Sequence, residues 1–292
     1  MKGIQEVCEK IEFPRETTKR LVEWYMAICA DDETKGLFHA AKAAYIDNDE
    51  EYYGKALEEI AKRGNIPRKT ADLLLLLDCA VDLRATYQEK GLSEELWVDT
   101  MKDLRNKLNE CEKVYGFSGV ACIGWLQRYF ICERFALGRL QYEKMEFPHL
   151  EYKGVIKKGD IVYNCHIPSS GPLLYEDVLD SLRRAYAFYK KELVNGIMPV
   201  TCVSWLLYPP HKEIFPDGTN VAKFRALFDI IEDGEDETDG DFWRVFHTTK
   251  REKLDSLAVT TGLQRRLKAY LQSGKHMGYG LGVLLFDGEK IL

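Results

Sequence analysis

Two polar side chains in the second half of the chain, Glu143 and His166, could take part in proton transfer. Carboxylate and imidazole groups are common general bases in proteins. His166 follows the apolar run 161–165 and precedes Pro168, so it stands at the end of an expected strand, where ligands of open α/β sheets gather. The alternative is a buried histidine that a backbone carbonyl satisfies.

A row of polar residues runs along the segment 135–147, which is expected to be a strand. Arg139, Gln141 and Glu143 are two residues apart and therefore share one face of that strand. Glu143 is the candidate base, while Arg139 and Gln141 are candidates for substrate binding. The alternative is an outer sheet face in solvent, on which Arg139 and Glu143 form a modest ion pair.

A small polar loop separates the His166 strand from a helix that is expected to begin near Tyr175. A glycine-bearing loop that leads into a helix presents unpaired backbone N–H groups and the positive end of the helix dipole, which suits a pyrophosphate. Ordinary strand-to-helix turns use the same residue types. The candidate residues of this loop are Ser169, Ser170, Gly171 and Leu173.

Two further residues, Trp205 and Asn220, are candidates for substrate binding. Trp205 lies in the apolar segment 203–207 and could form the wall of a slot, although a core aromatic is the simpler interpretation. Asn220 follows Gly218-Thr219, and capping of a helix that starts at Val221 would be enough to explain it.

Five short motifs occur in an order that resembles a known family. The motifs are GRLQYE at 138–143, HIP at 166–168, GPL at 171–173, SWLL at 204–207, and Asn220. Together they resemble the bacterial acyltransferase domain-containing proteins, which join a helical N-acyltransferase amino-terminal domain to a GNAT-like carboxy-terminal domain. The resemblance covers nearly the whole chain. It implies a GNAT-like fold that accepts acetyl-CoA or another acyl-CoA as co-substrate, and it assigns no acceptor.

Acyl transfer from a thioester to an amine needs a base for the amine proton, N–H donors for the oxyanion and an acid for the leaving thiolate. With Glu143 and His166 as the candidate bases, the leading hypothesis is an acyl-CoA-dependent N-acyltransferase that acts on a small amine. The expected partners are therefore a small-molecule acyl donor and an amine acceptor.

The chain departs from the usual GNAT phosphate loop, in which a Gln or Arg precedes GxG or GxA ahead of the central helix. Ser169-Ser170-Gly171 occupies the analogous place with fewer glycines. A catalytically inactive GNAT-like module that binds a ligand or acts as a scaffold therefore stays open as an alternative. A third possibility is an interaction protein whose helical first half binds a partner.

The elements that must position these residues fall into two halves. Helical periodicity covers 17–30, 37–46, 52–63, a helix that begins after Pro67, and 94–114, with Gly64, Gly91 and Gly116 as stops. Residues 1–133 are thus predicted to form an all-helical N-terminal domain. Residues 134–292 are predicted to form a GNAT-like mixed β-sheet domain flanked by helices, an α+β or α/β arrangement.

The expected strands of this second half are 135–147, 161–167, 200–207, 242–247 and 282–286, and helices are expected at 178–193, near Lys212, at 221–231 and at 262–272. The acidic segment 232–241 is predicted to be a solvated, mobile loop. It does not fit a calcium-binding EF-hand, because Phe246 falls where a bidentate Glu is required. Gly278-Tyr279-Gly280-Leu281-Gly282 is predicted to serve a turn or close strand packing, since no helix follows it.

Composition excludes several classes of protein. The 292 residues carry a net charge of −6, which gives no basic face for nucleic acid. No apolar run approaches the roughly 20 residues of a membrane span, and the amino terminus lacks the apolar centre of a secretory signal, so a cytoplasmic protein is expected. Eight cysteines without a CxxC pair indicate free thiols and no metal site. The oligomeric state does not follow from the sequence.

Overall fold

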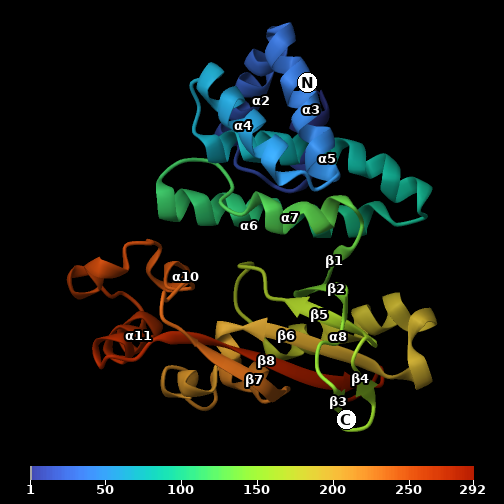
Figure 1. The fold of residues 1–292 in the computed structure, drawn as a ribbon, viewed down its shortest axis with the longest axis vertical. Coiled ribbons are helices and arrows are strands. Elements are labelled where there is room, and N and C mark those ends of the chain that lie inside the picture. Colours follow the sequence, from blue (N-terminus) through green and yellow to red (C-terminus); the bar gives the residue numbers. More distant parts are fainter. Residues whose placement is uncertain (1) are drawn as a thin grey trace. The chain divides into compact units, whose positions relative to one another are not determined.

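The computed structural model describes residues 2–292 and divides the chain into two compact units, Met1–Phe135 and Ala136–Leu292 (Figure 1). The sequence pattern places the division two residues earlier, after Glu133. None of the helices within residues 2–292 is both long and apolar enough to cross a bilayer.

The first unit consists of helices, blue to green in Figure 1. They are α1 (Lys2–Lys10), α2 (Arg15–Ala30), α3 (Asp32–Ile46), α4 (Glu50–Arg63), α5 (Arg68–Glu89), α6 (Glu94–Tyr115) and α7 (Ile123–Phe130). Pro67 immediately precedes α5, and Gly116 ends α6 in the left-handed conformation, as the sequence predicts. The prediction lacks α1 and α7, which are nine and eight residues long and so show little more than two turns of periodicity.

The helix α5 is the centre of this unit. It contacts α1, α4, α6 and α7, and each residue of Leu73–Leu77 is fully buried. Because neighbouring helices cover α5 on several sides, no face of its middle part is exposed to solvent. The middle of α5 is accordingly apolar around its whole circumference.

The second unit contains a six-stranded sheet in the order β1-β2-β5-β6-β8-β7. The strands are β1 (Arg134–Leu137), which spans the division point, β2 (Leu140–Glu146), β5 (Ile161–His166), β6 (Met198–Ser204), β7 (Asp229–Asp236) and β8 (Met277–Phe286). β5 and β6 are parallel, whereas β2–β5, β6–β8 and β7–β8 are antiparallel. The mixed sheet with flanking helices confirms the fold class expected from the sequence.

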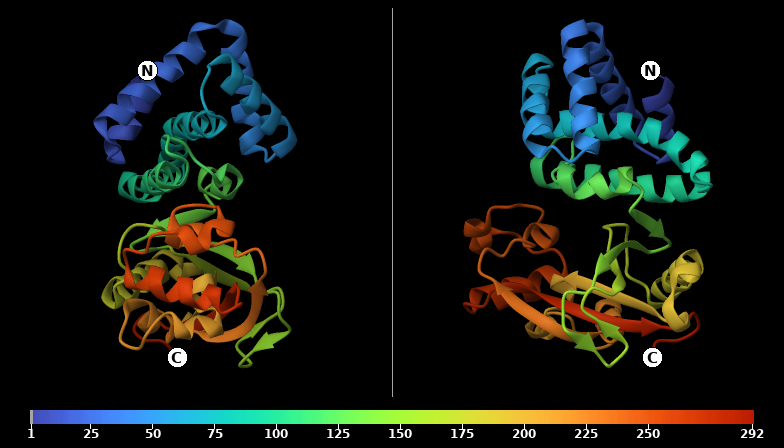
Figure 2. Two further views of the ribbon diagram at one scale, coloured as in Figure 1. Left: turned by 90° about the vertical axis from the view of Figure 1, so that its left-hand side faces the viewer. Right: turned by 45° about the vertical axis from the view of Figure 1, so that its right-hand side comes forward.

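The two faces of the sheet have different covers. Helix α8 (Tyr175–Tyr189) lies on one face, where its Ser181 Oγ is 3.2 Å from the Tyr142 hydroxyl and its Tyr189 ring is 4.4 Å from the ring of Tyr163. On the other face, the small hairpin of β3 (Glu151–Tyr152) and β4 (Ile156–Lys157) packs with strand residues in one apolar cluster; Figure 2 shows this hairpin near the C-terminus. The buried members of this cluster are Phe147, Tyr152, Ile156, Val162, Val283 and Leu285.

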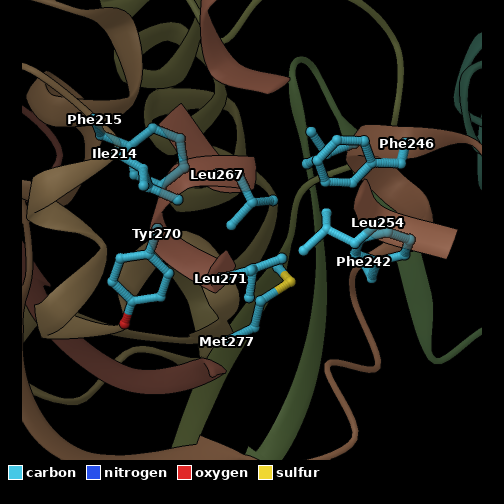
Figure 3. Packing of buried hydrophobic residues seen from close by; sticks show 10 residues of the cluster. Ile214, Phe215, Phe242, Phe246, Leu254, Leu267, Tyr270, Leu271 and Met277 are labelled. Atoms are coloured by element: carbon cyan, nitrogen blue, oxygen red, sulfur yellow. The ribbon is translucent and has the colours of Figure 1, made fainter. Parts of the chain in front are cut away.

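A separate apolar cluster holds the helices that follow β6. Leu267 and Leu271 of α11 (Gly262–Gln272) lie between Ile214, Phe215 and Tyr270 on one side and Phe242, Leu254 and Phe246 on the other (Figure 3). The short helices α9 (Asn220–Arg225) and α10 (Trp243–Phe246) also follow β6. Two 3-10 turns, Lys190–Glu192 and Val194–Gly196, precede β6, and three follow it: Trp205–Leu207, Pro209–Glu213 and Arg251–Ser256.

Two predictions about this region are wrong. Half of the acidic segment 232–241, residues 232–236, is not a mobile loop but part of β7, the edge strand that pairs with β8 (orange and red in Figure 2). Charged side chains suit an edge strand, because they discourage pairing with a further chain. The segment 242–247 forms helix α10 instead of a strand, since Phe242 and Phe246, four residues apart, stack with ring centroids at 4.5 Å.

The glycines of β8 serve close strand packing, as the sequence predicts. A Cβ on Gly278 would lie 2.4 Å from the carbonyl oxygen of Gly234 in β7, and a Cβ on Gly280 would lie 2.6 Å from the carbonyl oxygen of Leu207. Backbone therefore approaches β8 more closely than any side chain would allow. Among the eight cysteines, all free, Cys8, Cys79, Cys111, Cys165 and Cys202 are buried and the other three are partly exposed.

Candidate active site

The register of β2 and β5 brings the candidate residues of these two strands together. Gln141 lies opposite His166, and Glu143 lies opposite Asn164. Because side chains alternate along a strand, these four residues share one face of the sheet. It is the face opposite the one that carries Tyr142 and helix α8.

The strongest contact in this group joins His166 and Glu143. His166 Nε2 is 2.8 Å from Glu143 Oε1, and the two side chains are 19% and 5% exposed. An ionised carboxylate can only accept hydrogen bonds, so this contact requires the proton on Nε2 and leaves the ring's lone pair on Nδ1. A histidine in this state can accept a proton while the carboxylate stabilises the resulting imidazolium.

Two further polar residues, Asn164 and Thr201, join the pair and are not among the residues that the sequence predicts. Asn164 Nδ2 lies 3.2 Å from His166 Nε2 and 3.5 Å from Glu143 Oε1, and Thr201 Oγ1 lies 3.3 Å from Asn164 Oδ1. The signal for Asn164 is present in the sequence, because it is a polar residue two positions before His166 in an otherwise apolar strand. Thr201 carries no such signal.

The backbone ladder between the parallel strands β5 and β6 ends beside this group. Their ladder consists of two residue pairs, Tyr163↔Val200 and Asn164↔Thr201. Past Asn164 and Thr201 the backbone ladder between the two strands ends, although the side chains of the next residues, Cys165 and Cys202, still share a hydrogen bond. β6 keeps its pairing with β8 up to Ser204, so only its β5 side opens.

The loop after β5 is held by Arg139. Its guanidinium donates to the carbonyl oxygens of Pro168 (3.1 Å), Gly171 (2.9 Å) and Pro172 (3.0 Å). Burial lowers the pKa of Arg139, and Asp177 in the first turn of α8 opposes that shift. Ser169, Ser170 and Gly171 are exposed and Leu173 is buried.

The comparison with known families agrees with this geometry. Residues 135–284 match the GNAT-like C-terminal domain, and residues 2–132 match the N-acyltransferase N-terminal domain. The chain belongs to the GNAT-like acyltransferases. This result confirms the resemblance found in the sequence.

Solved structures of acyltransferases share the fold of this GNAT-like acyltransferase. A mutant in complex with octanoyl-CoA is 20% identical with a TM-score of 0.75, and the match covers 97% of this chain and 87% of that one. A complex with decanoyl-CoA and teicoplanin gives the same values. A complex with CoA and 10C-teicoplanin is 21% identical with a TM-score of 0.74, over 95% and 86% of the two chains. No protein of curated function matches the sequence.

The solvent-exposed alternative for the polar row of this GNAT-like acyltransferase is wrong. Gln141 and Glu143 are buried, and Arg139 lies in the turn between β1 and β2 instead of in a strand. The carboxylate of Glu143 is held by the histidine, while Arg139 binds the loop carbonyls. A turn residue does not follow the two-residue alternation that places strand residues on one face.

Trp205 and Asn220 lie apart from the polar row along the chain. Trp205 belongs to the 3-10 turn that follows β6 and packs against the α11 cluster, with its ring 5.5 Å from Phe215 and 5.8 Å from His211. This packing agrees with the core interpretation. Asn220 is the first residue of α9, and the cap is Thr219, whose hydroxyl accepts a hydrogen bond from the Ala222 amide. The expectation that Asn220 caps this helix is therefore wrong.

Neither a reactive thiol nor a metal cluster adjoins the polar row. The hydrogen bond with Cys202 and burial hold the pKa of the Cys165 thiol well above its usual value, so it is not a thiolate nucleophile. Among the residues that the structure describes, no three His, Cys, Asp or Glu side chains are grouped to hold a metal ion. His166 and Glu143 therefore stay the candidate residues for proton transfer at this site.

Proposed function

We propose that this GNAT-like acyltransferase transfers an acyl group from an acyl-CoA to an amine of a small molecule. The observation that carries the proposal is the 2.8 Å contact between His166 and Glu143 at the end of β5, beside the opening between β5 and β6. A base held by a carboxylate next to a gap in a sheet suits direct transfer between two bound substrates.

His166 is the proposed general base and Glu143 the residue that positions it. As the amine nitrogen attacks the thioester carbonyl, its proton moves to Nδ1 of His166, and the imidazolium is stabilised by the Glu143 carboxylate. The carbon–sulfur bond then breaks, and the thiolate of CoA takes up the proton held by the His166 imidazolium, which restores the neutral base. The products are an amide and free CoA.

The opening between β5 and β6 is the proposed place of the acyl donor. Backbone amide groups of β6 beyond Thr201 have no partner strand on the β5 side, and the donor's own amide groups could pair with them. The loop 168–172 would meet the pyrophosphate, because it leads into helix α8 and Arg139 holds its shape through three of its carbonyl oxygens. Solved acyltransferases of the same fold hold octanoyl-CoA or decanoyl-CoA, which supports this class of donor.

Turnover tests the proposal directly. Release of CoA from acetyl-, octanoyl- and decanoyl-CoA is followed with a thiol reagent in the presence of a panel of small amines. His166→Ala and Glu143→Gln should each lower kcat by ~10²-fold or more. His149→Ala is the matched control, since His149 lies 3.3 Å from Glu232 in a second histidine–carboxylate pair away from this row. Full activity in both site variants would refute the assignment of the base.

An inactive ligand-binding module is the second candidate function. The loop has few glycines, and Glu176 and Asp177 place negative charge in the first turn of α8, which weakens its attraction for phosphate. Thermal unfolding with acyl-CoA thioesters separates the candidates, because a ligand at a hundredfold its Kd stabilises the folded state by roughly 2.7 kcal/mol. Stabilisation without turnover on any amine would favour the module.

A further inference from the structure

A buried amide, Asn164, stands between the His166–Glu143 pair and the point where the backbone ladder between β5 and β6 ends. It is 6% exposed and lies opposite Glu143 of β2 on one side and opposite Thr201 of β6 on the other. The three residues form a row across three strands on one face of the sheet. Thr201 belongs to the last residue pair of the β5–β6 ladder.

Glu143 and Thr201 together fix the orientation of this amide. Thr201 Oγ1 donates to Asn164 Oδ1 at 3.3 Å, so the carbonyl end of the amide faces β6 and the NH₂ end faces β2. The reversed amide would place its oxygen against the Glu143 carboxylate and leave the NH₂ group against the threonine. A buried arrangement of two facing acceptors is unfavourable, so the carboxylate selects this orientation, and the Thr201 hydroxyl holds the carbonyl end in place by donating to it.

The selected orientation places two donors around a single carboxylate oxygen. His166 Nε2 lies 2.8 Å from Glu143 Oε1, and Asn164 Nδ2 lies 3.5 Å from it, at the outer limit of a hydrogen bond. Nδ2 is also 3.2 Å from Nε2, but with the proton on Nε2 this contact joins two donors, because an amide NH₂ group cannot accept a hydrogen bond. The amide therefore gives the Nε2–H group no acceptor that competes with the carboxylate.

We propose that Asn164, held by Thr201, is a positioning residue that directs the Glu143 carboxylate to His166 and so keeps the imidazole in its Nε2–H tautomer. Its consequence for catalysis rests on the proposed function, whereas the tautomer itself does not. Through its hydrogen bond to Asn164, Thr201 links the position of His166 to β6, the strand that borders the opening. The sheet thus fixes the position of the proposed base relative to the proposed donor site.

The tautomer is measured on the full-length protein without substrate, from the ¹⁵N shifts of the imidazole nitrogens. The His166 signals are assigned by their loss in His166→Ala. The neutral ring should be Nε2–H in the wild type, a mixture of tautomers in Asn164→Ala and Thr201→Val, and again Nε2–H in Thr201→Ser, which keeps the hydroxyl. Asn164→Leu keeps a similar volume and removes the NH₂ donor without adding an acceptor, so it replaces Asn164→Ala if that variant does not fold.

Thr70→Val is the matched control for loss of a buried hydroxyl. Thr70 Oγ1 donates to the Ser118 carbonyl oxygen at 2.6 Å in the first unit, so this variant also loses a buried hydrogen bond. It should leave the His166 tautomer unchanged. An unchanged tautomer in Asn164→Ala or Asn164→Leu would overturn the positioning role, whatever the activity.

Kinetics gives the second readout. Asn164→Ala should lower kcat about tenfold or more with the KM for acyl-CoA little changed, because a misplaced base slows the chemical step without removing a donor contact. Thr201→Val should act in the same direction, and Thr201→Ser should restore the rate. A mixed tautomer in the variants of a protein that turns over no amine would defeat the proposed function and leave the positioning role intact. A rise in KM alone would contradict the positioning role.

Discussion

At the scale of single residues, the cationic side chain of Arg139 has a structural role in the site. The guanidinium of Arg139 donates to three carbonyl oxygens of the loop 168–172, a number that the single ammonium of a lysine cannot match in the same geometry. The arginine thus sets the shape of the loop at the proposed phosphate site. Its own charge is directed at carbonyl oxygens of the protein.

Arg139→Lys should therefore weaken the donor site without touching the base. We expect the KM for acyl-CoA to rise about tenfold, since at least one charged hydrogen bond of roughly 1.5 kcal/mol is lost from the loop, while kcat stays near the wild-type value. Steady-state kinetics with varied acyl-CoA measures this. Arg184→Lys is the control, because Arg184 is exposed on α8 and pairs with Asp180 at 2.6 Å. A kcat effect without a KM effect would speak against the loop role.

The sequence predicts the residue types of the site better than their contacts. Alternation along the two strands points to Glu143 and His166, but their 2.8 Å contact depends on the register of β2 against β5, which the connecting hairpin sets. Arg139 shows the limit of the same rule, since one turn residue breaks the two-residue period. Thr201 enters the row only through the β5–β6 pairing, and pairing between strands distant in sequence leaves no local signal.

At the scale of elements, β8 is shaped by what packs against it. Its glycines allow the backbone of β7 and of the turn after β6 to lie where side chains would otherwise stand. The closeness of these contacts explains why β8 extends from Met277 to Phe286 although only 282–286 has the apolar pattern of a strand. The strand β7 could not be predicted from its acidic composition, because its pairing with β8 decides its conformation.

Gly280→Ala tests this close packing. A Cβ at this position would lie 2.6 Å from a backbone oxygen that cannot move aside easily, so we expect a loss of about 1 to 3 kcal/mol in unfolding free energy and a lower Tm. Gly36→Ala is the control with the opposite sign. Gly36 lies in α3 with nothing within 4 Å of its added Cβ, and alanine should stabilise that helix by roughly 0.5 to 1 kcal/mol. Equal Tm values for the two variants would contradict the packing argument.

A buried carboxyl in α5 makes the first unit sensitive to pH. Burial raises the pKa of Asp72 to about 6, although Arg68 at 2.7 Å opposes the shift. A carboxyl whose folded-state pKa exceeds its unfolded value near 3.9 stabilises the fold when it is protonated, and that stability is lost as the pH rises from about 4 to 6. Asp72→Asn should raise the Tm at pH 7.5 and change it little at pH 4.5, as measured by thermal unfolding. A lower Tm at pH 7.5 would show that the ion pair outweighs desolvation.

At the scale of the whole molecule, the change of period near residue 134 predicts the division into two units, because helical spacing gives way there to strand alternation. Sequence patterns do not give the boundary to the residue, since β1 continues across it. Each unit has its own core, and each contains a buried titratable group whose pKa is displaced in its own direction. The pH response of stability therefore differs between the units.

Between pH 7 and pH 5 the two units should change stability in opposite directions. Burial lowers the pKa of His211 in the second unit, where its Nδ1 lies 2.7 Å from the Trp205 carbonyl oxygen among aromatic rings. In the unfolded chain this histidine has a pKa near 6.5, whereas its pKa is lower in the folded state. Protonation therefore favours the unfolded state, and the second unit loses stability as the pH falls through this range. The first unit gains stability as Asp72 takes up its proton, by about 1.4 kcal/mol per pH unit below 6.

Native-state hydrogen exchange at pH 5, 6 and 7, corrected for intrinsic rates, measures both units in one full-length sample. Slow amides of α5 should gain protection as the pH falls, while those of β6 and β8 should lose it. The carboxyls with lowered pKa, such as Glu12 and Asp31, titrate below this range and do not mask the effect. Asp72→Asn should remove the first trend alone and His211→Asn the second alone. A common trend in both units would mean that neither buried group controls the stability of its unit.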